Sequence, residues 1–152
     1  EDDCGFIDSQ FKTNSKYPDI IAFPACGASK SYDCTIEERK MRYNSFDGSF
    51  IVKHMKESVD KLLERNGLSI NDVDRFCFTQ FAYPIITGSA EILGVDLDKF
   101  IYVGDKYGYT GTSSPMVALH DAIEDGRIKR GDRVMFWSIG GNWVTCALLL
   151  QY

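Results

Sequence analysis

The residues able to do chemistry in this chain are few and widely spaced. His54 and His120 both fall in segments with helical periodicity, so they form no pair at the spacing of a metal site or a catalytic triad. The cysteines are odd in number and show no short paired spacing; they are Cys4, Cys26, Cys34, Cys77 and Cys146. We therefore expect no metal site and five free thiols in a reducing cytoplasm, with Cys77 and Cys146 buried in strands.

Two glycine-rich segments could present backbone groups to a ligand. Residues 104–111 lack the glycine spacing of a dinucleotide or P-loop motif, which argues against a nucleotide site. This segment is either a loop whose backbone passes close to a ligand, beside the free N–H groups of a helix starting at Ser114, or a loop that only needs glycine torsions. Gly140 and Gly141 could likewise form an oxyanion hole or simply make a tight hairpin turn.

Several motifs follow one another in the second half of the chain. They are Gly-Tyr-Thr-Gly-Thr-Ser-Ser-Pro at 108–115, Ala-Leu-His-Asp-Ala at 118–122, Gly-Arg-Ile-Lys-Arg-Gly-Asp at 126–132 and Ile-Gly-Gly at 139–141, with Asp-Gly-Ser-Phe-Ile at 47–51 as a weaker extension. In this order they resemble the C-terminal half of beta-ketoacyl-acyl-carrier-protein synthase III, a condensing enzyme of the thiolase superfamily. The resemblance implies that residues 1–152 form a C-terminal thiolase-like domain of the α/β class, a five-stranded mixed sheet with helices packed on its faces.

The resemblance also implies a site built from two halves. The family uses a cysteine nucleophile on its N-terminal half, and a histidine and an asparagine that donate hydrogen bonds to an enolate. Thr79 stands here at the histidine position and Tyr109 at the asparagine position, so both usual donors are replaced. With the backbone of Gly140 and Gly141 as an oxyanion hole, these are the catalytic candidates. The expected substrate pocket comprises Gln80, Phe81, Tyr107 and Gly108.

Two functions agree with this pattern. In the first, the chain pairs with an N-terminal thiolase-like half that carries the cysteine, and works as an acyltransferase or condensing enzyme. Its substrate is then a coenzyme A or phosphopantetheine thioester, with no bound cofactor. In the second, the chain is a catalytically inactive subunit that completes the dimer or pocket of an active partner. The first is slightly favoured by analogy, because the superfamily is broad in its chemistry. Within it, the replaced donors fit acyl transfer better than condensation, since acyl transfer without decarboxylation needs no enolate hole. The resemblance further implies a dimer, acyl carrier protein as a candidate partner, and a place in fatty acid or polyketide biosynthesis.

The elements that must position these residues follow from hydrophobic periodicity. Apolar residues from Phe50 to Leu63 share one helical face, which predicts a long helix that ends at Asn66-Gly67. Shorter helices are predicted over residues 85–93, between Pro84 and Gly94, and from Ser114-Pro115 to about residue 124. Strands are predicted at residues 5–7, 19–23, 73–79 and 100–103, and at 133–138 and 143–150 as a hairpin; residues 26–43 and 104–114 are predicted to be irregular.

Composition and charge exclude several classes of protein. The chain has 152 residues, of which 44% are hydrophobic and 26% charged, as expected for one globular domain with one core. Its net charge of -5 and scattered basic residues argue against a nucleic-acid partner. Apolar runs are far shorter than the roughly 18 residues that cross a bilayer, and no leader-like segment opens the chain. We therefore expect a cytoplasmic protein without a membrane partner.

Overall fold

The computed structural model describes residues 4–16, 18–141 and 143–152. Its main strands are β1 (Gly5–Thr13), β4 (Arg75–Phe78), β5 (Arg133–Gly140) and β6 (Val144–Gln151). Its helices are α1 (Phe50–Arg65), α2 (Tyr83–Leu93), the single turn α3 (Gly104–Tyr107) and α4 (Ser114–Glu124). Two short strands, β2 (Ile21–Ala22) and β3 (Arg42–Tyr43), form a separate ribbon.

The four main strands form one mixed sheet in the order β1-β6-β5-β4. β6 is antiparallel to both β1 and β5, whereas β4 runs parallel to β5. The predicted hairpin is confirmed, because β5 and β6 pair from Arg133 opposite Gln151 to Gly140 opposite Val144. The predicted strand at residues 5–7 is longer than expected and continues to Thr13 along β6.

The expected fifth strand, residues 100–103, is reduced to a single bridge. Phe100 pairs with Phe76 of β4, and the Ile101 N–H donates a hydrogen bond of 2.9 Å to the Phe76 carbonyl. The ladder stops there because the Val103 N–H donates instead to Oε1 of Gln80, at 2.9 Å. A side chain thus replaces the backbone partner that a full strand would need, and the sheet has four strands rather than five.

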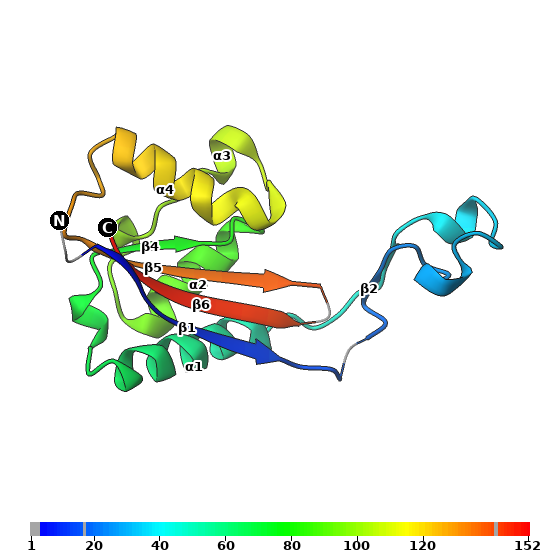
Figure 1. Ribbon diagram of the computed structural model, residues 1–152, viewed down its shortest axis with the longest axis horizontal. Coiled ribbons are helices and arrows are strands. Elements are labelled where there is room, and N and C mark those ends of the chain that lie inside the picture. Colours follow the sequence, from blue (N-terminus) through cyan, green and yellow to red (C-terminus); the bar gives the residue numbers. More distant parts are fainter. Residues whose placement is uncertain (1–3, 17, 142) are drawn as a thin grey trace.

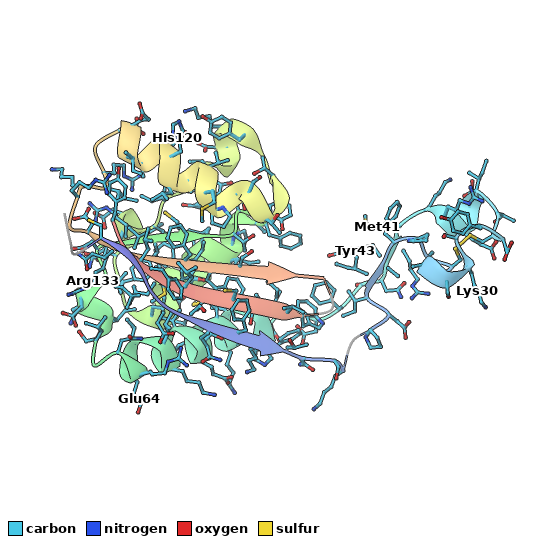
Figure 2. The ribbon with its side chains drawn as sticks, in the orientation of Figure 1. Lys30, Met41, Tyr43, Glu64, His120 and Arg133 are labelled. Carbon is cyan, nitrogen blue, oxygen red and sulfur yellow. A yellow bond between two sulfur atoms is a disulfide. The ribbon has the colours of Figure 1, made fainter. Side chains whose placement is uncertain are left out.

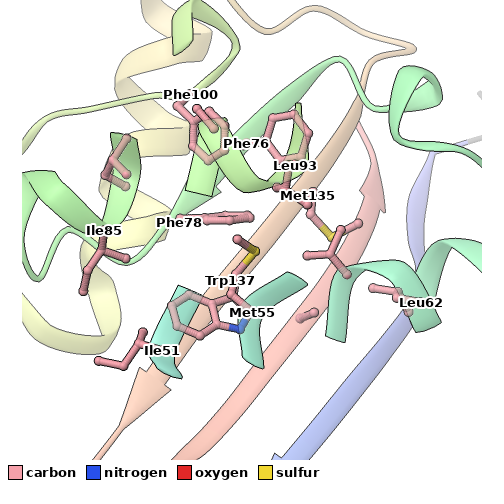
Figure 3. Packing of buried hydrophobic residues seen from close by; sticks show 14 of the residues in the cluster. Ile51, Met55, Leu62, Phe76, Phe78, Ile85, Leu93, Phe100, Met135 and Trp137 are labelled. Atoms are coloured by element: carbon pink, nitrogen blue, oxygen red, sulfur yellow. The ribbon is translucent and has the colours of Figure 1, made fainter. Parts of the chain in front are cut away.

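Helices cover both faces of this sheet (Figure 1). Helices α1 and α2 lie on one face, where they bury the large side chains of β4 and β5, including Phe76, Phe78, Met135 and Trp137 (Figure 3). On the opposite face, Ala118 and Ala122 of α4 pack on a second cluster with Cys77, Val134 and Phe136. Successive side chains of a strand point to opposite faces of the sheet, so neighbouring residues of β5 belong to different clusters.

The three predicted helices are confirmed, although α2 begins at Tyr83, two residues before the predicted start. α1 ends at Arg65, and Gly67 after it has a φ of 65°. α2 has a proline in its first turn and ends at Gly94, whose φ of 68° is the left-handed conformation that glycine adopts at little cost. The loop predicted at residues 104–114 contains the single turn α3 and a 3₁₀ turn at Gly111–Ser113. None of the described helices has the length and apolarity needed to span a membrane.

Residues 21–43 form an arm that projects from the body of the domain (Figures 1 and 2). At its base β2 pairs with β3, Ile21 opposite Tyr43 and Ala22 opposite Arg42, so the strand predicted at 19–23 keeps only two residues. A disulfide joins Cys26 and Cys34 in the arm. The prediction of five free thiols is therefore wrong for these two cysteines, whose Cα atoms lie 6.7 Å apart in the folded arm although the residues are eight positions apart in the sequence. Cys4, Cys77 and Cys146 are free.

Candidate functional site

A cavity of about 130 Å³ lies where the β5–β6 hairpin, the base of the arm and the start of α1 meet. Four of the eight predicted site residues line it: Phe81, Tyr109, Gly140 and Gly141. Its other walls are almost entirely apolar or aromatic, and comprise Ile20, Ile21, Tyr43, Phe46, Ile51, Ile139 and Trp143. Such a lining suits an uncharged, apolar group.

Tyr109 reaches this cavity from the loop before α4. The loop turns at Gly108 and Gly111, whose φ angles of 69° and 66° favour glycine. The Tyr109 ring packs edge to face against Phe81, with 5.5 Å between the ring centroids and 82° between the ring planes. Both side chains are close to half exposed, at 47% and 44%. The two segments that the sequence motifs indicated, 79–82 and 108–115, therefore meet at the cavity through an aromatic pair.

A second aromatic group closes the side of the cavity towards α1. The Trp143 ring lies 4.7 Å from both Phe46 and Phe50, edge-on in each case. Trp143 has a φ of 59°, a left-handed conformation that is uncommon outside glycine and that turns the chain back into β6. The tip of the hairpin also touches the arm, because a Cβ on Gly141 would lie 3.7 Å from the side chain of Ile21.

Thr79, predicted to stand at the family's histidine position, lies outside the cavity lining. It follows β4 directly, and its N–H continues the β4–β5 ladder with a hydrogen bond of 2.8 Å to the Trp137 carbonyl. Its side chain is fully buried, and Oγ1 has no hydrogen-bond partner among the described residues. The threonine hydroxyl is therefore not among the groups that line the cavity with Tyr109.

Gln80, expected in the substrate pocket, is instead a buried connection between three segments. Its Nε2 donates to the carbonyls of Phe78 at 2.8 Å and Ile101 at 3.1 Å, and its Oε1 accepts from the Val103 N–H. Its own N–H donates to Oγ of Ser114 at the start of α4, at 3.2 Å. The side-chain amide therefore uses both of its hydrogens and one acceptor position to hold residues 101–103, which lead into the Tyr109 loop, against the end of β4.

Tyr107 and Gly108 are also not among the residues that line the cavity. The Tyr107 hydroxyl donates a hydrogen bond of 3.1 Å to Asp121 of α4, and Nζ of Lys106 donates to the same carboxylate at 2.8 Å. The hydrogen bond from Lys106 is the main reason that the pKa of Asp121 lies below its ordinary value. This exposed cluster attaches α3 to α4.

The remaining titratable candidates do not form a catalytic group. Burial raises the pKa of the Cys77 thiol from its ordinary value of 9.0 to about 12, so this cysteine is protonated and unreactive at neutral pH. Burial, and then the nearby charge of Lys12, lowers the pKa of His54, which packs on Phe50 with 5.1 Å between the rings. In the described part of the chain, no three or more His, Cys, Asp or Glu side chains cluster in a way that could hold a metal ion.

Sequence reasoning missed the residues that the first third of the chain contributes to the cavity. Ile21 and Tyr43 come from the two ends of the arm, and Phe46 precedes the Asp-Gly pair before α1. Phe46 sits beside the motif at 47–51 that extended the family resemblance, and this proximity was the available signal. No sequence signal indicated the arm residues Ile21 and Tyr43, because they reach the cavity only when β2 pairs with β3.

Curated proteins similar to this chain are named beta-ketoacyl-[acyl-carrier-protein] synthase III. The protein from Koribacter versatilis is 29% identical over 155 residues, which is 99% of this chain and 46% of that protein. The protein from Neisseria gonorrhoeae is 30% identical over 158 residues, covering 99% of this chain and 47% of that protein. The chain thus spans about half the length of the curated relatives it matches.

Solved structures agree with these matches. Over the whole of this chain, the synthase III of Thermus thermophilus superposes with a TM-score of 0.85 at 27% identity, and that of Aquifex aeolicus with 0.81 at 26% identity. The chain covers 47% and 46% of those structures. The family model described as 3-oxoacyl-[acyl-carrier-protein (ACP)] synthase III C terminal matches residues 63–152. A thiolase-like half, with its sheet between helices and its glycine hairpin at the cavity, is therefore the fold of this chain, which belongs to the synthase III C-terminal family.

Proposed function

We propose that this chain is the C-terminal half of an acyltransferase or condensing enzyme that acts on acyl thioesters of coenzyme A or acyl carrier protein. The cysteine nucleophile is supplied by an N-terminal half. The observation that carries this proposal is the apolar cavity at which Tyr109, in the family's asparagine position, meets Gly140 and Gly141. Such an enzyme would work as a dimer in fatty acid or polyketide biosynthesis in the cytoplasm.

The walls of the cavity support an acyl group as its occupant. Its volume of about 130 Å³ is similar to the roughly 150 Å³ apolar cavity that holds one benzene molecule. A chain of about six carbon atoms or an aromatic acyl group is the size that this comparison favours. Phe46, Phe81 and Trp143 offer apolar contact, and no charged side chain lines the cavity among the described residues. A free carboxylate or phosphate is therefore not favoured inside it.

The donors at the cavity favour acyl transfer over decarboxylative condensation. The thiolate of the N-terminal half would attack the thioester carbonyl, so that a new C–S bond forms while the bond to coenzyme A breaks. Coenzyme A leaves as a thiolate, which takes up a proton from solvent. Backbone N–H groups of Gly140 and Gly141 can stabilise the oxyanion of that step without any side chain. The enolate of condensation needs further donors, and Tyr109 is the one side-chain candidate that lines the cavity at a family position.

A second candidate function is an inactive subunit that completes the pocket of an active partner. The burial of Thr79 favours it, because the residue predicted at the histidine position is not among those that line the cavity. The aromatic pair Phe81–Tyr109 favours it as well, since the Tyr109 ring stands at the position assigned to a smaller polar asparagine in the family. In this case the chain would contribute only shape to the cavity.

The two functions are separated by intact-mass measurements on the assembly of this chain with its N-terminal half. The assembly is incubated with coenzyme A thioesters of short, medium, long and aromatic acyl groups. A covalent mass increment equal to the acyl group, removed by hydroxylamine, is the result expected for the enzyme. If no thioester leaves an adduct, the acyl-enzyme proposal fails and the inactive subunit is the better description. Pretreatment with a thiol-blocking reagent is the control, since it must abolish any adduct made on a cysteine.

A further inference from the structure

The arm at residues 21–43 has no hydrophobic core of its own. None of these residues, all of which the structure describes, is buried. Beyond the β2–β3 pairing its two sides are joined by exposed hydrogen bonds, such as that of 3.0 Å from the Ala25 N–H to the Lys40 carbonyl. Water competes for such bonds, so they hold a chain only weakly. A small unit without a core needs a covalent cross-link, which the Cys26–Cys34 disulfide supplies.

This disulfide is open to reagents in solution. Figure 2 shows the bond, drawn in yellow, in the outer part of the arm, away from the sheet. Cys26 and Cys34 are both partly exposed, and Tyr32 in the segment between them is 91% exposed. A thiolate can therefore approach the bond without unfolding of the domain. Exposed disulfides are the ones that exchange with other thiols, whereas buried ones act as permanent cross-links.

The other end of the arm forms a wall of the cavity. Ile21 and Tyr43, the first pair of β2 and β3, both line it. The Ile21 side chain lies 3.7 Å from the position of a Cβ on Gly141, and the Tyr43 ring lies 6.3 Å from the ring of Phe46, measured between centroids. Two strands of two residues each are too short to stay paired by themselves. This wall of the cavity therefore depends on the closed arm beyond it.

We propose that Cys26 and Cys34 form a thiol–disulfide exchange site whose oxidation state controls the order of this cavity wall. The inference rests on the proposed function in one respect, since the cavity that it controls is the proposed acyl site. In the disulfide form the arm is closed, and Ile21 and Tyr43 are held at the cavity. In the dithiol form the arm gains conformational freedom, β2 and β3 separate, and the cavity opens to water on this side.

The exchange partner is a dithiol reductant, and the reaction balances. One thiolate of the dithiol attacks a sulfur atom of the disulfide, so the bond between Cys26 and Cys34 breaks, a mixed disulfide forms and the other cysteine leaves as a thiolate. The second thiolate of the dithiol then attacks the mixed disulfide and releases the first cysteine. Two electrons pass to the protein, the two thiol protons of the reagent end on its two cysteines, and the reagent becomes a disulfide. In the cytoplasm, the compartment named in the proposed function, disulfides are usually transient ones of this kind.

Access to the bond is tested with dithiothreitol on the native protein. The wild type is treated without denaturant, excess iodoacetamide is added, and intact mass and peptide mapping locate the additions. We expect two more additions than without dithiothreitol, on Cys26 and Cys34. Buried Cys77 is the internal control and should stay unmodified while the domain is folded. The proposal is overturned if no addition is gained, or if Cys77 reacts to the same extent as the arm cysteines.

Control of the cavity wall is tested by amide hydrogen exchange with mass spectrometry. Exchange at residues 20–22 and 42–46 should be at least about tenfold faster in the reduced wild type and in Cys34→Ser than in the oxidised wild type, because these segments then open locally. Exchange in α4 should not change, and Cys4→Ser, which removes an exposed free thiol, should match the oxidised wild type. If either the reduced wild type or Cys34→Ser exchanges like the oxidised protein, the bond does not control the wall.

The outcome is separable from that of the proposed function, since hydrogen exchange is measured without any thioester. Exchange that depends on reduction, without an acyl adduct on the assembly, would support the redox site and reject the enzyme. An adduct on the assembly, with exchange that is indifferent to reduction, would support the enzyme and reject the redox site. Where both hold, the Cys34→Ser assembly should form the adduct more slowly than the Cys4→Ser assembly, and equal rates would overturn control of the cavity by the bond.

Discussion

The ring of Tyr109 stands edge to face against the ring of Phe81, with centroids 5.5 Å apart, at the wall of the apolar cavity. An edge-to-face pair of this kind adds about 0.5–1.5 kcal/mol beyond simple burial, so it restrains the tyrosine that is predicted to stand at the family's asparagine position. The phenol group is thereby held beside Gly140 and Gly141, with which it shares the cavity. This relationship makes Tyr109 the side chain whose role in turnover is most directly testable.

Tyr109→Phe keeps the aromatic pair and removes only the hydroxyl. If the phenol donates a hydrogen bond to the reacting oxygen, acyl transfer by the assembly should slow by about 10²–10³-fold, as when one oxyanion donor is lost. The measurement is single-turnover transfer from an acyl-coenzyme A thioester. Tyr152→Phe is the control, because Tyr152 packs against Arg130 and does not line the cavity. An unchanged rate for Tyr109→Phe would remove this hydroxyl from the mechanism.

Gln80→Leu should destabilise the fold strongly although it conserves size. The variant leaves the carbonyls of Phe78 and Ile101 and the N–H of Val103 without the partners that the amide supplies. Buried groups left unsatisfied cost about 1–3 kcal/mol each, so we expect the free energy of unfolding to fall by about 3 kcal/mol or more. Urea unfolding followed by circular dichroism measures the change.

Gln10→Leu supplies the comparison for that experiment. The Gln10 amide lies at the surface and donates to the Phe11 carbonyl, where water can replace it. Its replacement should change the unfolding free energy by no more than about 0.5 kcal/mol. Equal effects of the two substitutions would show that the Gln80 amide does not hold the three segments together.

The sequence predicts the helices of this domain well because their signals are local. The apolar face of α1 and the Pro84 and Gly94 that bracket α2 are properties of a dozen adjacent residues. The fifth strand was predicted from apolar residues alone, and it is lost because Gln80, more than twenty residues earlier, takes the N–H of Val103. A hydrophobic pattern cannot show that the Gln80 side chain competes with the β4 backbone for the Val103 N–H, because the two meet only after the chain has folded.

The candidate site also combines residues that the sequence motifs predicted with residues that only the folded structure reveals. Motif order was sufficient to indicate Tyr109, Gly140 and Gly141, which the cavity brings together. Motif order could not show that Thr79 is fully buried and does not line the cavity, because the side chain of the first residue after a strand can point to either face of the sheet. Nor could it place Ile21 and Tyr43 at the cavity, since they depend on the pairing of two strands that are each two residues long.

The disulfide between Cys26 and Cys34 predicts a definite pattern of alkylation. In denaturant without a reductant, iodoacetamide should modify three cysteines, Cys4, Cys77 and Cys146, and after reduction it should modify all five. Intact-mass spectrometry counts the additions. Five additions without reduction would show that the arm is not closed by a disulfide in the isolated protein.

The same bond should protect the arm from proteolysis. A disulfide restrains the chain that it closes, so Cys34→Ser should increase the rate of cleavage within residues 27–33. Cys4→Ser removes an exposed free thiol and should leave that rate unchanged. Limited proteolysis with peptide mapping distinguishes the two variants, and similar rates for both would mean that the bond does not order the arm.

Cys77 predicts how stability changes in alkaline solution. Burial raises the pKa of its thiol to about 12, so the folded protein keeps this proton at a pH where the unfolded chain, with an ordinary value of 9.0, has released it. The stabilising contribution is complete below pH 9.0 and is lost as the pH rises from there towards 12.

Other groups titrate in the same range, so the measurement is the difference in unfolding free energy between wild type and Cys77→Ala as a function of pH. Cys77→Ala should lose less stability than the wild type above pH 9.0, whereas Cys4→Ala should follow the wild-type profile. Parallel profiles for all three proteins would show that the Cys77 thiol is not held in its protonated form by the fold.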